Sequence, residues 1–262
     1  MRKRILSICL AGILSFSLFG CSQDNSGKEA SGEQKPVEIY LTRHGKTMLN
    51  TTDRMQGWSD APLTEPGVEV AEYLGKGLKA EDVKFDYAYS SDSGRAIETA
   101  NIVLDKNGQS DLTVTQSEDL REVCFGIFEG ELNETAWTEV AKANNMTFGE
   151  FMETFDMARN LDMNAKMPGN EIAESSEELA NRVKPEIDRI AKEVEENGGG
   201  NVLIVSHGIT IMSFLAEVDP ACLDSLEAGL SNASVCKVKY EDGKYTVESV
   251  NDISYVEKGK SE

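Results

Sequence analysis

The stretch VEIYLTRHG, residues 37–45, decides the fold. Its first six residues are rich in β-branched and aromatic side chains, so they predict a strand that runs directly into Arg43, His44 and Gly45. A second stretch, NVLIVSHG at 201–208, begins with a near-continuous apolar run, which is typical of a parallel strand buried on both faces. The two stretches indicate a parallel sheet in which two strands each end in a His-Gly pair.

Strand and helix patterns alternate between and around these stretches. Further strands are predicted at 85–90 and 112–115, and a hairpin at 234–240 and 245–250. Helical spacing of apolar residues predicts helices at 64–78, 93–104, 175–196 and 209–217, and a less regular helical region at 133–164. We expect Pro185 to kink the third of these helices or to mark a break near its start. The alternation predicts an α/β fold, a three-layer α/β/α sandwich whose sheet is mostly parallel, with helices on both faces.

The N-terminal residues have the pattern of an export signal. A basic start at residues 1–4 precedes an apolar run at 5–19 that is too short to span a bilayer comfortably. The tetrapeptide LFGC, residues 18–21, resembles the bacterial lipobox. We therefore expect a signal peptide at 1–20, lipidation of Cys21, a flexible tether at 21–35, and a folded domain at 36–256 held outside the bacterial cell membrane by acyl chains. The alternative is an ordinary signal peptide with a chance cysteine.

Charge and cysteine content restrict the partners and the class of site. Acidic residues outnumber basic ones by 46 to 26, which gives a net charge of −20. Such a surface argues against a nucleic-acid partner and requires that any phosphate site be a local basic pocket. The spacing of Cys124, Cys222 and Cys236 fits no zinc framework, so we expect three buried thiols rather than a disulfide.

Side chains with reactive or phosphate-binding groups gather at the predicted strand ends. His44 and His207 each follow a strand, and ligands of open α/β sheets bind at this edge. Arg95 lies in the first turn of a helix, a position that suits a cation only if an anion is bound nearby. Arg43 offers a second planar guanidinium. Glu122 follows the third strand, where a protonated carboxyl group can act as a general acid.

Several motifs together resemble the histidine phosphatase superfamily, in its phosphoglycerate mutase-like branch 1. The resemblance runs from about residue 37 to about 250 and implies the fold of that family. It is carried by LTRHGKTMLN (41–50), QGW (56–58), PLT (62–64), SSD (90–92), RA with TA (95–96, 99–100), LRE (120–122) and VSHG (205–208).

The resemblance implies roles by position. It gives a catalytic set of His44, Glu122, His207, Arg43 and Arg95, in which His44 attacks phosphorus and carries the phosphoryl group. It gives a substrate-binding set of Arg43, Asn50, Gln56, Gly57, Arg95 and His207. Glu122 matches the proton donor of this branch, because Gly208 stands where the other branch has an aspartate.

The expected activity is hydrolysis of a small phosphorylated substrate, a phosphate monoester, through phosphohistidine. The scheme requires no metal or cofactor. By analogy with the family, a helical cap insertion at about 130–175 sets specificity. One alternative is a phosphoglycerate mutase, but mutases typically continue the glutamate as Glu-Arg-His-Tyr-Gly, whereas here Val123-Cys124-Phe125-Gly126 follows Glu122. The other alternative is a phosphate-binding lipoprotein without catalytic activity.

Overall fold

A single mixed sheet organises the described chain. The computed structural model describes residues 35–224, 226 and 229–262. Within these residues the strands lie in the order β3-β2-β4-β1-β5-β6. Their bounds are β1 (Val37–Arg43), β2 (Tyr87–Ser91), β3 (Val114–Ser117), β4 (Gly200–Ser206), β5 (Val235–Glu241) and β6 (Lys244–Asp252). The first four are mutually parallel, and β5 and β6 form an antiparallel hairpin on β1. The predicted α/β fold with a mostly parallel sheet is confirmed.

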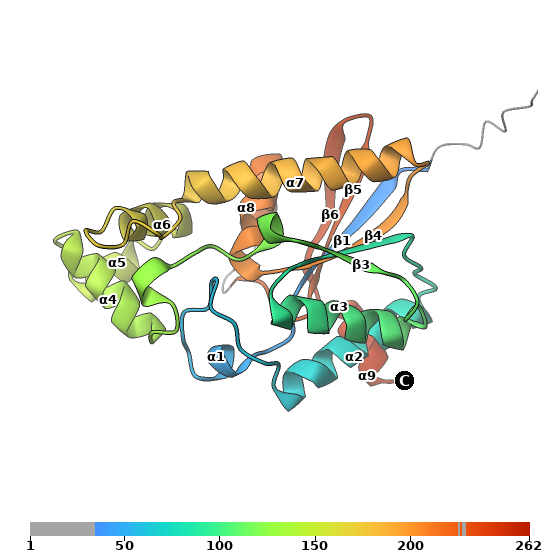
Figure 1. Ribbon diagram of the computed structural model, residues 1–262, viewed down its shortest axis with the longest axis horizontal. Coiled ribbons are helices and arrows are strands. Elements are labelled where there is room, and N and C mark those ends of the chain that lie inside the picture. Colours follow the sequence, from blue (N-terminus) through green and yellow to red (C-terminus); the bar gives the residue numbers. More distant parts are fainter. Residues whose placement is uncertain (1–34, 225, 227–228) are drawn as a thin grey trace, which may run out of the picture. The chain divides into compact units, whose positions relative to one another are not determined.

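The helices cover both faces of the sheet (Figure 1). Their bounds are α1 (Met48–Thr51), α2 (Glu65–Ala80), α3 (Gly94–Asn107), α4 (Asn133–Ala143), α5 (Phe148–Glu153), α6 (Met157–Ala165), α7 (Ser176–Glu196), α8 (Gly208–Val218) and α9 (Ser254–Lys260). Short 3-10 helices lie at Glu118–Leu120, Gly126–Phe128 and Pro220–Leu223. Helices α2, α3 and α9 lie on one face, and α7 and α8 on the other.

The alternation of side chains along β4 divides the core between these faces. Val202 and Ile204 pack with α7 and α8, whereas Leu203 and Val205 pack with α2 and α3. All four are fully buried. Because successive side chains of a strand point to opposite faces, a strand covered on both sides has to be apolar throughout. This explains why the sequence of β4 lacks the polar alternation of a half-exposed strand.

Helix α7 has almost the bounds that the sequence predicted, and it is continuous. It begins at a capping box in which the Ser175 hydroxyl accepts from the backbone N–H of Glu178, and the Glu178 carboxylate accepts from that of Ser175. The helix then runs through Pro185 without a break. Of the two expectations for Pro185, a kink or a break, the break is wrong, because packing of the apolar stripe on the sheet outweighs the one backbone hydrogen bond that proline removes.

Other features also differ from the prediction, among them the start of β2, which lies at Tyr87 rather than at residue 85. Strand β3 begins two residues later than expected, because Leu112 belongs to a turn in which its N–H donates to the carbonyl of Gln109. Helix α9, only seven residues long, was not predicted. It packs so closely on α2 that a Cβ at Gly77 would lie 1.7 Å from the carbonyl oxygen of Tyr255, so the contact requires glycine.

The predicted signal peptide at 1–20, Cys21, and all of the tether except Lys35 lie outside the described residues. No helix in the part of the chain that the structure describes is long and apolar enough to cross a membrane. The three cysteines of the domain are free thiols; Cys124 and Cys236 are buried, whereas Cys222 is half-buried, so the expectation of three buried thiols is wrong for Cys222. Cys222 lies in the surface turn Pro220–Leu223 that follows α8, which leaves its side chain partly in contact with solvent.

Candidate active site

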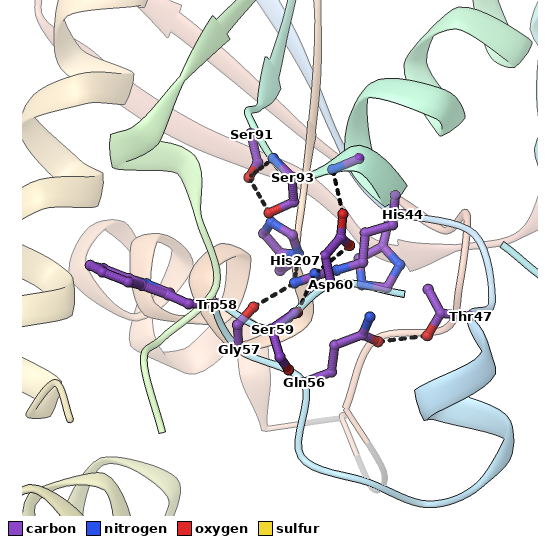
Figure 2. A network of polar contacts seen from close by, with 12 residues as sticks. His44, Thr47, Gln56, Gly57, Trp58, Ser59, Asp60, Ser91, Ser93 and His207 are labelled. Atoms are coloured by element: carbon purple, nitrogen blue, oxygen red, sulfur yellow. Dashed lines mark hydrogen bonds and ion pairs between the residues drawn. The ribbon is translucent and has the colours of Figure 1, made fainter. Parts of the chain in front are cut away.

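The two histidines meet at the carboxyl ends of neighbouring strands. β1 and β4 pair in parallel with Arg43 opposite Ser206, and the backbone N–H of His44 donates to the carbonyl of Ser206 at 3.0 Å. The rings of His44 and His207 meet edge to face, with centroids 5.2 Å apart and an angle of 62° between the ring planes (Figure 2). Both side chains are buried. Strand register thus brings together two residues that are 163 positions apart in the sequence (207 − 44).

A backbone carbonyl sets the tautomer of His44. The ring nitrogen Nδ1 lies 2.7 Å from the carbonyl oxygen of Gly45. A carbonyl can only accept, so Nδ1 carries the proton and Nε2 keeps its lone pair in the neutral ring. The atom with nucleophilic character is therefore Nε2.

A guanidinium sets the opposite tautomer in His207. Nη2 of Arg95 lies 3.0 Å from Nδ1 of His207. Guanidinium can only donate, so Nδ1 accepts and the proton of the neutral ring lies on Nε2. That Nε2 is buried and has no hydrogen-bond partner among the described residues. A buried donor of this kind is costly unless an acceptor completes it.

The electrostatic environment keeps both rings neutral. Burial lowers the pKa of His44 well below 6.5, and the positive charges of Arg95 and Arg43 lower it further. Burial, Arg95 and the neighbouring His44 likewise lower the pKa of His207. At neutral pH the pair is therefore uncharged, and the lone pair of His44 Nε2 is available.

Different contacts hold the guanidinium groups of Arg43 and Arg95 in place. Nη1 of Arg43 donates to the carbonyl of Leu230. Arg95, which is 1% exposed, donates to the carbonyls of Gly57 (2.8 Å) and Ser59 (2.9 Å). It also forms an ion pair with Asp60 at 2.9 Å. The Nε atoms of both arginines are buried without a partner within the described residues, so both retain a donor that can serve an anion.

Asn50 and Gln56 lie together at the side of this cluster. Oε1 of Gln56 accepts from the hydroxyl of Thr47 at 2.6 Å and from the amide of Asn50 at 3.3 Å. Its amide nitrogen Nε2 is buried and has no partner in the described part of the chain. The orientation of Gln56 is thus fixed by its oxygen, while its N–H groups stay available as donors.

The side chain of Glu122 lies against the N-terminus of α8, the helix that begins directly after His207. Its carboxylate accepts from the backbone N–H groups of Ile209 (3.0 Å), Thr210 (2.9 Å) and Val123 (3.1 Å). The side chain is buried, and its charge raises the pKa of Arg43, although burial lowers the pKa of Arg43 by more. Glu122 is therefore both a carboxylate in the site and a counter-charge for Arg43.

The arrangement as a whole suits a phosphoryl group. Four side-chain nitrogens of this cluster are buried donors without a partner among the described residues, and they accompany a free imidazole lone pair; they are Arg43 Nε, Gln56 Nε2, Arg95 Nε and His207 Nε2. Arginine, amide and imidazole N–H groups are the usual ligands of phosphate oxygens. The cluster can therefore bind a phosphoryl group and offer it a nucleophile.

Three other features of the site were not predicted from the sequence: the Asp60–Arg95 ion pair, the bonds from Glu129 to the loop 57–59, and the contacts of Arg182 with the backbone around Glu122. Arg121 forms an ion pair with Asp92, and its guanidinium carbon lies 5.1 Å from the ring centre of Trp58. The position of Asp60 close after the QGW motif is the one signal that could have indicated its role.

Comparisons with known proteins agree with this geometry. Residues 39–253 match the family model described as histidine phosphatase superfamily (branch 1). A 2,3-bisphosphoglycerate-dependent phosphoglycerate mutase of Parvibaculum lavamentivorans is 33% identical over 207 residues, which cover 79% of this chain and 90% of that protein. A crystal structure of phosphoglycerate mutase from Bacillus anthracis is 49% identical, covers 87% of this chain and 98% of that chain, and has a TM-score of 0.81.

A mycobacterial glucosyl-3-phosphoglycerate phosphatase shares the fold at 24% identity and a TM-score of 0.64, covering 83% of this chain and 100% of that chain.

Proposed function

The chain belongs to branch 1 of the histidine phosphatase superfamily, and we propose that it is a phosphatase that hydrolyses phosphate monoesters through a phosphohistidine on His44. The observation that carries this proposal is the pairing of tautomers. The rings of His44 and His207 have centroids 5.2 Å apart; His44 Nε2 has a free lone pair and His207 Nε2 has an unpartnered N–H, so a nucleophile and a hydrogen-bond donor for a phosphate oxygen belong to one cluster.

The first step forms a bond between His44 Nε2 and phosphorus while the bond from phosphorus to the ester oxygen breaks. Charge develops on the equatorial oxygens during this transfer, and positive groups stabilise it. We assign this task to Arg43, Arg95 and His207, which lie close to His44 and have buried donors without a partner among the described residues. Asn50 and Gln56 complete the binding of the phosphate from the side. Gly57 contributes through its carbonyl, which holds Arg95.

Glu122 is the proposed proton donor to the leaving oxygen: in its protonated form it gives up the proton as the ester bond breaks, and it is left as the carboxylate. In the second step the same carboxylate takes a proton from the water that attacks phosphohistidine, which returns His44 to its starting state. The backbone N–H groups at the start of α8 hold the carboxylate next to His207. The charge of Glu122 raises the pKa of Arg43, so the second role to be tested for Glu122 is that of a counter-charge. Proton donation and charge compensation predict different kinetics for Glu122→Gln.

A phosphoglycerate mutase is the second candidate, favoured by the names of the relatives at 33% and 49% identity. A bisphosphorylated intermediate would need a second group of cations beyond those around His44. Two arginines close to the segment of Glu122 are already paired, Arg121 with Asp92 and Arg182 with Glu174. The net charge of −20 also disfavours a polyanionic ligand. These observations favour the hydrolase.

The decisive experiment compares two reactions of the purified protein. We expect release of nitrophenol from p-nitrophenyl phosphate without added cofactor, and interconversion of 3- and 2-phosphoglycerate at a far lower rate. A faster interconversion that depends on 2,3-bisphosphoglycerate would favour the mutase. Bound phosphate without any nitrophenol release between pH 4 and 9 would favour a binding protein.

The nucleophile is tested by His44→Ala. Removal of Nε2 leaves no atom to form the covalent intermediate, so we expect no measurable turnover. Acid-sensitive phosphate trapped on the wild-type protein should map to His44 by mass spectrometry and be absent from the variant. Label at another residue would contradict the mechanism.

We propose that α4, α5 and α6, in the predicted cap at about 130–175, set the choice of substrate. Trp137 of α4 stacks on Phe151 of α5 at 5.7 Å and meets Phe155 edge to face at 6.1 Å. Most of the aromatic side chains of the cap therefore pack against one another. Four large apolar side chains of the cap remain exposed and are available to a ligand: Leu132 (41%), Met152 (46%), Phe155 (41%) and Ile172 (70%).

We further propose that the protein is exported and anchored through Cys21, on the sequence pattern of residues 1–21 alone. Metabolic labelling with a radioactive fatty acid in a bacterial host should mark the wild-type protein and not Cys21→Ser. Equal labelling of both would contradict the anchor.

A further inference from the structure

Glu129 makes an unusual set of hydrogen bonds beside the site. Its Oε1 accepts from the backbone N–H groups of Trp58 and Phe125, both at 2.9 Å. Its Oε2 accepts from those of Gly57 (3.1 Å) and Ser59 (2.9 Å). Three of these four donors belong to the single loop 57–59. One carboxylate therefore fixes three successive peptide groups of that loop, and hydrogen bonds to an ionised acceptor are stronger than neutral ones.

The other side of the same loop holds Arg95. The carbonyl of Gly57 accepts from Nη2 of Arg95 at 2.8 Å, and the carbonyl of Ser59 accepts from Nη1 at 2.9 Å. Figure 2 shows Gly57, Trp58 and Ser59 along the loop that passes His207. The loop thus turns its N–H groups to a carboxylate and two of its carbonyls to a guanidinium.

One peptide group of the loop is hydrogen-bonded both to the Glu129 carboxylate and to the Arg95 guanidinium. The peptide between Gly57 and Trp58 donates its N–H to Glu129 and accepts from Arg95 through its C=O. In a trans peptide these two bonds point in opposite directions, so the peptide dipole lies between the negative and the positive group. Each bond polarises the peptide in the sense that strengthens the other. The charge of Glu129 is in this way coupled to the position of Arg95.

Glycine at position 57 makes the contact possible. A Cβ there would lie 2.0 Å from the carbonyl oxygen of Val123 and 2.3 Å from Oε1 of Glu129. Any side chain would push the loop away from Glu129, so the approach is specific to this residue.

We propose that Glu129 is a positioning residue that holds the Arg95 guanidinium in its phosphate-binding orientation through the Gly57–Trp58 peptide. The proposal rests on the proposed function, in which Arg95 binds the phosphoryl group. Glu129 does not touch the substrate. A role in the fold alone is the alternative, because the chain around Glu129 is also tied to Met55 by backbone bonds from Met55 to Glu131 and from Gly130 to Met55.

The test is a double-mutant cycle on the affinity for inorganic phosphate, measured by calorimetry. In Glu129→Gln the amide group has one oxygen for four donors, and its own N–H₂ faces two of them. We expect phosphate binding at least about tenfold weaker, the loss of roughly one charge-assisted hydrogen bond. Adding Glu129→Gln to Arg95→Ala should weaken binding no further, because the positioned group is already gone.

Glu178→Gln is the matched control. Glu178 also accepts backbone and hydroxyl hydrogen bonds, but it does so in the capping box of α7, so its loss should leave phosphate affinity unchanged. Wild-type affinity in Glu129→Gln, or losses that multiply in the double variant, would overturn the proposal.

Glu129→Asp decides the matter if the Gln variant does not fold. It keeps the charge but shortens the reach, and we expect phosphate affinity between those of wild type and Glu129→Gln. A folded Asp variant with wild-type affinity would overturn the proposal, and so would failure of both variants to fold, which would assign Glu129 to the fold alone. Wild-type protein that binds phosphate but hydrolyses no ester would contradict the proposed function and leave this test valid.

Discussion

At the scale of single residues, the site depends on which hydrogen-bond partner each imidazole meets. His44 meets a carbonyl and His207 meets a guanidinium, so the same side chain presents a lone pair in one place and a proton in the other. Burial and the two arginines lower both pKa values, so neither role is lost to protonation near neutral pH. Two identical side chains thereby acquire complementary tasks.

The role of Glu122 is tested by Glu122→Gln. Proton donation matters most for a poor leaving group, so kcat for an alkyl phosphate should fall by roughly 10² to 10⁴, and kcat for p-nitrophenyl phosphate far less. Stopped assays with both esters measure the ratio. Glu118→Gln, in the same stretch but with a largely exposed side chain, serves as the control. Equal losses on both esters would leave Glu122 as a counter-charge for Arg43 rather than an acid.

At the scale of elements, neighbouring parallel strands and the helices that follow them place the site. β1 and β4 end in register, and α8 begins at once after His207, so its first N–H groups receive Glu122. Helix α7 covers the same face of the sheet and continues through Pro185. Its stability comes from the apolar stripe that it buries, since proline contributes no backbone hydrogen bond at that turn.

Pro185→Ala should therefore stabilise the protein. Pro185 is exposed, so little packing is lost, and alanine restores the N–H that can donate to the carbonyl of Asn181. We expect the free energy of unfolding to rise by about 1 to 3 kcal/mol in urea titrations. Lys192→Ala, also exposed on α7, should change it by less than about 0.5 kcal/mol. A lower stability for the proline variant would mean that the helix is adapted to the ring.

At the scale of the whole molecule, a small group of cationic side chains lies inside a strongly acidic protein. The group consists of Arg43 and Arg95, whereas the full sequence has a net charge of −20. Long-range attraction of anions is therefore poor, and any binding of an anion at this cluster depends on its short-range hydrogen-bond donors. Enclosure of the histidines also makes the stability of the fold depend on pH.

The sign of that dependence follows from the lowered pKa values. Below pH 6.5 the unfolded chain binds a proton on each of the two histidines, while the folded state does not. Stability is therefore complete above pH 6.5 and is lost as the pH falls, by up to about 1.4 kcal/mol per pH unit for each histidine. Urea unfolding at pH 7.5 and 5.5 measures it, and His207→Asn should reduce the slope. Equal free energies of unfolding at both pH values would show that the rings are not buried as neutral species.

The sequence by itself determined the order of the elements and the family. Apolar periodicity indicated most helices and strands, because each buried face must be covered by apolar side chains at the spacing of its element. The errors fell on short or local features: the start of β3 at a turn, α9, and the continuity of α7 at Pro185. The motifs around His44 and His207 indicated which side chains should meet, because strand ends of a parallel sheet share one edge.

Only the tertiary structure decided the state of those side chains. The tautomer of His207 depends on Arg95, 112 residues away in sequence, and the position of Arg95 depends on a loop that Glu129 fixes from 70 to 72 residues away. Such bonds join segments that no periodicity relates. They form only when packing of the sheet and helices has brought the segments within hydrogen-bond distance, which is why the residues could be named from the sequence but their protonation and orientation could not.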